Sequence, residues 1–164
     1  MVLHRLTAIL MMLGLIAAGC GYKPSAPPPP KPDTCTDADA PAADTVKQAI
    51  AAVPQLTPGN AWIETARGHT QNCRLYWVQI SSSNATASTP GQVVFFDRNT
   101  PLGTPTPNPK PYLTVLASGD DTVMIQYQWQ VGDDPPCCPT GIGTARFQIG
   151  KDGKLKALDP VPNQ

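Results

Sequence analysis

Residues 122–131, TVMIQYQWQV, are the stretch that decides the fold expected of this chain. Apolar side chains occupy every second position, and glutamines stand between most of them. The apolar row is Val123, Ile125, Tyr127, Trp129 and Val131, and the polar row is Gln126, Gln128 and Gln130. Successive side chains of a strand point to opposite faces, so the pattern predicts a strand with one buried and one water-facing side. Antiparallel sheets that pack on one face commonly show this alternation.

Five further segments alternate in the same way or are rich in β-forming residues: 61–66, 73–80, 92–97, 112–117 and 144–149. Residues 117–121 have the composition of a hairpin turn, and residues 135–143 connect the last two long strands. Residues 97–111 contain five prolines, which cannot take part in a central strand. We therefore expect a long surface loop there, of the kind that often carries function.

One segment before these strands has helical rather than alternating periodicity. Within residues 39–53, the apolar positions at helical spacing are Ala42, Val46, Ala49, Ile50 and Val53. Pro41 suits the first turn of a helix, and Pro54 ends it. The pattern predicts an α+β fold, in which one N-terminal amphipathic helix packs on an antiparallel β-sheet of about five or six strands.

The N-terminus indicates export and lipidation. Residues 1–19 read as a signal peptide, because a short polar start precedes an apolar run too short to span a bilayer. The run ends in small residues before Cys20, which outlines a lipobox, although Ala17 stands where leucine is usual. The alternative is a plain secretory signal with Cys20 as an ordinary thiol. We expect acylation of Cys20 to hold the protein on the extracytoplasmic face of the cell membrane.

The remainder divides into a spacer and one domain. Residues 20–34 form a tether, and six of the eleven residues from 22 to 32 are proline, which favours an extended spacer. Residues 35–160 have the length of a single α+β ectodomain. Charged residues make up 15% of the 164 residues and cancel, so no basic field exists to attract nucleic acid.

Four cysteines remain after Cys20, namely Cys35, Cys73, Cys137 and Cys138, and an even number in an exported domain predicts two disulfides. A Cys35–Cys73 bridge would staple the helix to the sheet and leave a vicinal Cys137–Cys138 bridge. The alternatives join each of the adjacent cysteines to a different distant one. We predict no metal site, because the spacing lacks the paired knuckles of a zinc site and only one histidine remains.

We identify no catalytic residue and no cofactor site. His69 is expected to be a solvated loop histidine, since no nucleophile motif accompanies it. The acidic pairs at 120–121 and 133–134 are typical of turns. The large aromatic residues either build the core or line a ligand cleft, and the core is favoured for Trp62, Trp77, Tyr127 and Trp129.

Several short motifs resemble those of the mycobacterial LppP/LprE lipoprotein family, and its LppP branch in particular. They are DTVKQAI at 44–50, NCRL at 72–75, FFDR at 95–98, LG at 102–103, DDTV at 120–123 and CCPTG at 137–141. The resemblance runs along nearly the whole mature chain. It implies an actinobacterial cell-envelope lipoprotein without an assigned activity.

These observations favour a membrane-anchored module that binds an envelope lipid, glycan or protein without catalysis. A carrier of a small hydrophobic ligand or lipid is the alternative, and would need an apolar cavity between helix and sheet. A hydrolase is less favoured, because it would need His69 in a cleft with a serine, aspartate or cysteine in reach.

Overall fold

The structure is a computed structural model that describes residues 29, 31–86 and 88–163. Its contacts separate residues 1–31 from a compact unit that runs from residue 32 to residue 164, and the following description concerns the second unit. The predicted signal peptide, the predicted lipidation site Cys20 and most of the predicted tether lie outside the described residues.

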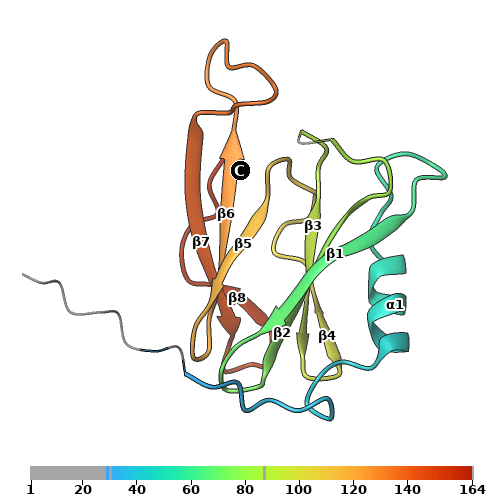
Figure 1. Cartoon of the computed structure of the whole chain (residues 1–164), viewed down its shortest axis with the longest axis vertical. Coiled ribbons are helices and arrows are strands. Elements are labelled where there is room, and N and C mark those ends of the chain that lie inside the picture. The colour runs from blue at the N-terminus through green and yellow to red at the C-terminus, as the bar shows by residue number, and fades with distance from the viewer. Residues whose placement is uncertain (1–28, 30, 87, 164) are drawn as a thin grey trace, which may run out of the picture. The chain divides into compact units, whose positions relative to one another are not determined.

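Among the described residues, eight strands form two antiparallel four-stranded sheets (Figure 1). The first sheet contains, in spatial order, β1 (Trp62–His69), β2 (Leu75–Ser82), β3 (Gln92–Asp97) and β4 (Thr100–Gly103). The second sheet contains β5 (Thr114–Ser118), β6 (Val123–Trp129), β7 (Gly141–Ile149) and β8 (Leu155–Ala157). Strands that follow one another in the chain are neighbours in both sheets, so each sheet is built from consecutive antiparallel strands.

The predicted fold class is wrong. Instead of an α+β fold with one sheet of five or six strands, the fold is mostly β, with two sheets and one short helix, α1 (Ala43–Ala51). Six of the strands lie in or near the predicted segments, but alternation along a strand does not say which sheet the strand joins. The chain leaves the first sheet after Gly103 and begins the second at Thr114.

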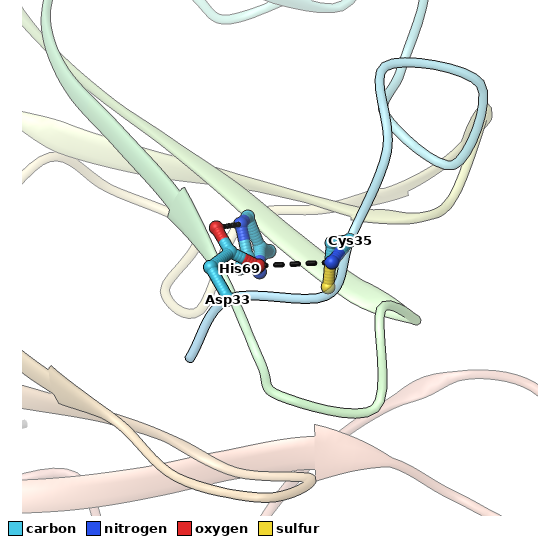
Figure 2. Close-up of side chains that lie close together, drawn as sticks. All are labelled: Asp33, Cys35 and His69. Carbon is cyan, nitrogen blue, oxygen red and sulfur yellow. Dashed lines mark hydrogen bonds and ion pairs between the residues drawn. The ribbon is translucent and has the colours of Figure 1, made fainter. Parts of the chain in front are cut away.

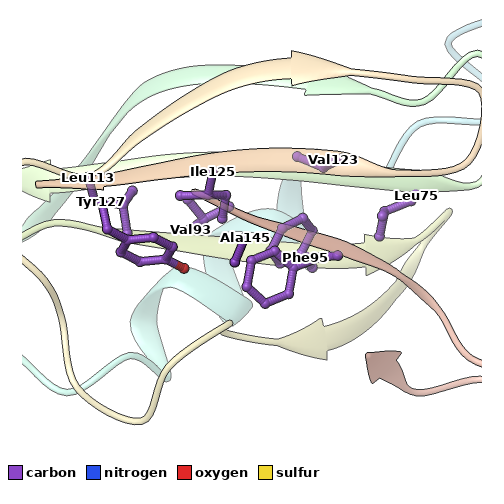
Figure 3. Packing of buried hydrophobic residues seen from close by; sticks show 9 residues of the cluster. Leu75, Val93, Phe95, Leu113, Val123, Ile125, Tyr127 and Ala145 are labelled. Carbon is purple, nitrogen blue, oxygen red and sulfur yellow. The ribbon is translucent and has the colours of Figure 1, made fainter. Parts of the chain in front are cut away.

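The main core lies between the two sheets (Figure 3). Its buried residues come from the facing sides of both sheets, and the ring centroids of Phe95 and Phe147 are 5.7 Å apart. The cluster consists of Leu75, Val93, Phe95, Leu113, Val123, Ile125, Tyr127, Ala145 and Phe147. The domain is therefore a β-sandwich whose interior is filled by side chains.

A second apolar cluster covers the opposite face of the first sheet. Val46 of α1 and Val53 lie in it together with alternate residues of two strands, Tyr76, Val78, Ile80, Val94 and Phe96. Because consecutive residues of β2 and β3 enter different clusters, both strands are nearly continuously apolar. The central strands β2 and β3 of the first sheet are thus covered on both faces, whereas the second sheet has an apolar cluster on its inner face.

The proline-rich segment 97–111 is not a continuous loop. Thr100–Gly103 forms β4, and Pro101 pairs with Phe96 at the edge of the first sheet. A proline is tolerated there because an edge strand needs its backbone N–H groups on one side only. Beyond β4, Thr106 is buried, and its carbonyl accepts a hydrogen bond of 3.0 Å from the Gln92 side chain.

The alternation of β6 is confirmed for its first half. Val123, Ile125 and Tyr127 are buried, as predicted. Trp129 is only half-buried, and Val131 is 52% exposed beyond the end of the strand, so the prediction of a buried face is wrong for Val131. The inner face of β6 extends only as far as the facing sheet covers it.

Candidate functional site

A tight turn between β1 and β2 holds the first group of candidate residues. Thr70 is fully buried, its N–H donates to the Leu75 carbonyl, and its hydroxyl donates to the Asn72 side chain. Cys73 has a φ of +54°, and its N–H donates to the Thr70 carbonyl at 3.0 Å. These bonds fix the backbone of the turn and the direction in which the Cys73 side chain leaves it.

A disulfide joins this turn to the segment that precedes the helix. Cys35 is bonded to Cys73, and their Cα atoms are 5.4 Å apart. The bridge connects residues 38 positions apart, so it ties the N-terminal segment, residues 32–41, to the end of the first sheet. Both cysteines are half-buried.

His69 is the last residue of β1, so the expectation of a solvated loop histidine is wrong. Its side chain is 26% exposed, and its ring lies 5.2 Å from that of Tyr76. Nδ1 is 3.1 Å from the Thr70 carbonyl, which can only accept, so Nδ1 carries the hydrogen. Nε2 points the other way and lies 3.2 Å from Oδ2 of Asp33 (Figure 2).

Asp33 is held in place by its own segment. Its Oδ1 accepts a hydrogen bond of 2.9 Å from the Cys35 backbone N–H, which turns Oδ2 toward His69 (Figure 2). One ligand atom each from Asp33, Cys35 and His69 lie within 4.8 Å of one another. The cysteine and histidine spacing gives no sign of this cluster, because Asp33 belongs to the predicted tether and lies 36 positions before His69.

The same residues line a surface hollow of about 360 Å³. Asp33, Cys35 and Asp37 lie on one side, and Arg67, His69 and Trp77 lie on the other. Tyr76 also lines it, and desolvation raises the pKa of its hydroxyl. The hollow offers carboxylate, imidazole and guanidinium groups at the surface beside aromatic rings.

The hollow brings together some of the groups that a covalent hydrolase uses. His69 has a carboxylate within reach, but the Cys35 sulfur is occupied by the disulfide and is not a free thiol. A nucleophile beside the base is required for covalent hydrolysis. Among the described residues, the arrangement therefore offers a histidine and an acid without the third group.

The other two cysteines lie in the loop that connects β6 and β7. The sulfur atoms of Cys137 and Cys138 face each other, and the vicinal disulfide stays a prediction. Asp134 organises the loop, since its Oδ2 accepts from the backbone N–H groups of Val131 and Thr140 at 2.8 and 2.7 Å. These bonds lower the pKa of Asp134. Both acidic pairs lie in turns, as expected.

The aromatic side chains are mostly structural. Tyr127 belongs to the main core, and the Trp62 indole N–H lies 3.2 Å from the carbonyls of Val53 and Pro54. Trp77 lines the hollow, but its indole N–H donates to Ser118 across the sandwich. The hollow beside the helix, lined by Ala49, Val53 and Val94 among others, measures about 220 Å³. This is below the roughly 300 Å³ at which typical ligand pockets begin.

The second sheet presents a mixed surface on the side away from the core, which we call its outer face. Its residues from two strands are Met124, Gln126, Gln128, Ile142, Thr144 and Arg146, in directly paired positions of β6 and β7. Ile142 is 59% exposed beside Gln128, and Leu116 at the bulge of β5 is 49% exposed. In the predicted glutamine row, Gln130 is exposed, and Gln126 and Gln128 are half-buried on this face near the exposed Ile142.

Comparison with known proteins places the chain in a family. A family model described as LppP/LprE lipoprotein matches residues 67–152. The chain is 63% identical over 153 residues to lipoprotein LppP of Mycobacterium tuberculosis and of Mycobacterium bovis, which covers 93% of this chain and 87% of those proteins. No solved structure matches the chain.

The family assignment agrees with the motifs that suggested it. The matched region begins in β1 and ends beyond β7, so it includes His69, Cys73 and the outer face of the second sheet. No helix among the described residues is long and apolar enough to cross a membrane. The chain belongs to the LppP/LprE lipoprotein family.

Proposed function

We propose that this lipoprotein displays a non-catalytic interaction module on the extracytoplasmic face of the cell membrane, and that the module binds another envelope protein. The single observation that carries the proposal is the outer face of the second sheet. The central strands β2 and β3 of the first sheet are covered on both faces by apolar clusters, whereas the outer face of the second sheet leaves Ile142 59% exposed.

The composition of the outer face supports a protein partner. The centre of a protein interface is depleted in charge and combines apolar contacts with hydrogen-bonding groups. Gln126, Gln128 and Thr144 supply amides and a hydroxyl beside Ile142. Arg146 is already paired with Asp159 through two guanidinium bonds of 2.8 and 2.9 Å, so it leaves no bare charge at this face.

The filled interior supports a module that binds at its surface rather than a carrier. Phe95, Phe147 and Ile125 occupy the space between the sheets and are almost completely buried. The cavity beside the helix is smaller than ligand pockets generally are. A lipid held between helix and sheet, as the carrier alternative requires, would therefore need a larger cavity than the structure has there.

In-cell photocrosslinking tests the proposed face. A benzophenone amino acid at Gln128 of the full-length lipoprotein, expressed in a mycobacterial host, should give an adduct of one discrete mass. The same probe at Thr65, on edge strand β1, is the matched control and should not give that adduct. Ile142→Glu should abolish the Gln128 adduct without changing the melting temperature, because Ile142 is exposed. Equal adducts at both positions, or adducts unaffected by Ile142→Glu, would show that the outer face is not the interface.

The anchor is tested separately at Cys20. Acylation and lipoprotein cleavage both require its thiol, and two or more acyl chains hold a protein firmly on a bilayer. Cys20→Ser should release the protein from the membrane or leave an uncleaved precursor. Metabolic labelling with a fatty-acid analogue measures this, and label persisting on the Cys20→Ser protein would refute the assignment.

A further inference from the structure

We propose that the Cys35–Cys73 disulfide masks a zinc site, and that reduction of this disulfide allows Asp33, Cys35, His69 and Cys73 to bind one Zn²⁺ ion. The inference is independent of the proposed interaction surface, which lies on the second sheet. It rests on four ligand-type side chains gathered at one end of the first sheet.

The distances fit a tetrahedral zinc site after a small adjustment. Zinc bonds of about 2.0 to 2.3 Å to nitrogen, oxygen and sulfur place tetrahedral ligand atoms roughly 3.3 to 3.8 Å apart. Nε2 of His69 and Oδ2 of Asp33 are 3.2 Å apart, and the ligand atoms of Asp33, Cys35 and His69 all lie within 4.8 Å. Nε2 and Oδ2 already have nearly this separation, whereas the two sulfur atoms must move apart from bonding distance after reduction, by rotation of the cysteine side chains.

His69 is oriented as a metal ligand. Metal-binding histidines usually donate their other ring N–H to a backbone carbonyl or carboxylate, which fixes the tautomer. Nδ1 of His69 faces the Thr70 carbonyl and keeps its hydrogen there, so Nε2 is the nitrogen that would bind zinc, in place of the hydrogen that it shares with Asp33. The buried Thr70 is held by its bonds to Leu75 and Asn72, so this carbonyl is rigid.

One half of the site, His69 and Cys73, has a spacing that zinc-binding segments use. Asp33 and Cys35 are separated by one residue, and His69 and Cys73 by three residues across the β1–β2 turn. The Cys35 N–H holds the Asp33 carboxylate beside Nε2, as described above. With the disulfide intact, Asp33 and His69 are the only two of the four groups with a free ligand atom, too few for a structural zinc site.

Opening the site is a two-electron reduction. A protein dithiol transfers two electrons and two protons to the disulfide, which becomes two thiols, while the reductant becomes a disulfide. Zn²⁺ then binds the two cysteines as thiolates and releases their protons. Both cysteines are half-buried rather than enclosed, and Asp33 is 63% exposed, so reductant and metal can approach.

Cobalt spectroscopy tests the site, because Co²⁺ occupies zinc sites and reports tetrahedral thiolate ligation in its visible bands. The full-length protein is purified in detergent with Cys137→Ser and Cys138→Ser, so that these thiols do not contribute. It is reduced with a phosphine, which is removed without oxygen. We expect one equivalent of Co²⁺ to bind with sulfur-to-cobalt charge transfer, and the oxidised protein to show none.

Ligand variants decide which residues hold the metal. Asp33→Asn and His69→Asn should each weaken cobalt binding by roughly tenfold or more, and Cys35→Ser should abolish the charge-transfer band. Asp37→Asn is the matched control, because Asp37 lines the same hollow but does not belong to the ligand cluster. If Asp33→Asn and His69→Asn bind cobalt as tightly as the parent, the proposal is wrong.

A stability measurement covers the case in which the reduced protein is partly unfolded. Zn²⁺ should raise the melting temperature of the reduced protein, or restore its near-UV circular dichroism, because the metal binds the folded state. A reduced protein that shows no cobalt bands and no response to zinc would overturn the proposal. Equal zinc binding by the oxidised protein would overturn the role of the disulfide.

Discussion

At the scale of single residues, the Tyr127 hydroxyl is an unusual feature of the core. The side chain is only 2% exposed, and its hydroxyl has no hydrogen-bond partner among the described residues. Desolvation raises the pKa of this phenol. A buried hydroxyl without a partner costs roughly 1 to 3 kcal/mol.

Tyr127→Phe should therefore leave the free energy of unfolding unchanged or raise it by up to about 1 kcal/mol. The substitution keeps the ring in the core and removes only the oxygen. Urea unfolding of the two proteins measures the difference. A loss of more than about 1 kcal/mol would instead indicate that a buried water bonds this hydroxyl.

Asp159 provides a residue-scale prediction about pH. Hydrogen bonds from the Arg146 side chain, and then from its backbone N–H, lower the pKa of Asp159 to about 2. Because the folded pKa lies below the unfolded value of about 3.9, the ionised carboxylate stabilises the fold above that value. This contribution is lost as the pH falls from about 4 to about 2.

Asp159→Asn should accordingly lower the melting temperature at pH 6, and the gap to the parent protein should close between about pH 4 and pH 2. Thermal unfolding monitored by circular dichroism across this range measures it. Asp133→Asn, at an exposed position in the β6–β7 loop, is the control. A gap that stays constant down to pH 2 would contradict the assigned ion pair.

At the scale of elements, the strands differ in how many of their faces are covered. Phe95 and Phe96 are adjacent in β3 and both fully buried, because each enters a different cluster. Phe95→Ala and Phe96→Ala should each lower the free energy of unfolding by about 3 to 5 kcal/mol. In β6, Ile125→Ala should cost about 2 to 5 kcal/mol, whereas Gln126→Ser should change stability by less than about 0.5 kcal/mol. Denaturant unfolding measures all four, and a small effect of Phe96→Ala would show that the helix-side cluster contributes little.

The pairing of β6 with β7 leads to a second prediction at this scale. Gly141 stands directly opposite Trp129, and a Cβ atom at Gly141 would lie 2.5 Å from the indole ring. Gly141→Ala should therefore lower the free energy of unfolding by about 1 to 3 kcal/mol, because the added methyl group displaces that ring. In a Trp129→Ala background the same change should cost much less, and a double-mutant cycle measures the coupling. Additive effects would mean that the indole moves aside freely.

At the scale of the whole molecule, one covalent bond joins the N-terminal segment to the sandwich. The double variant Cys35→Ser with Cys73→Ser should lower the free energy of unfolding by about 2 to 5 kcal/mol, because the unfolded chain loses a crosslink between residues 38 positions apart.

Peptide mapping of the unreduced full-length protein should find the Cys35 and Cys73 peptides linked. Finding Cys35 linked to the peptide of Cys137 and Cys138 would exclude this connectivity.

The candidate site shows why part of it escaped prediction. The number of cysteines and the expected compartment predict two disulfides, and the preferred pairing, Cys35 with Cys73, is confirmed. Asp33 lies in a proline-rich stretch without periodicity, so no pattern connected it with His69, 36 positions later. The contact of Asp33 with His69 depends on where the N-terminal segment lies against the first sheet, and the Cys35–Cys73 disulfide holds this segment beside the β1–β2 turn.

The sequence by itself determined the family, the strand at 92–97 and the buried half of β6, because motifs and side-chain alternation are local properties of the chain. Only the tertiary structure decided that the strands divide into two sheets and that β2 and β3 are buried on both sides. It alone brings Asp33 to His69 and leaves one sheet with an outer face of half-exposed apolar residues. The physical reason is that burial depends on which distant segment covers a surface. A periodic pattern indicates that one face of a strand is covered, but it does not identify the segment that covers it.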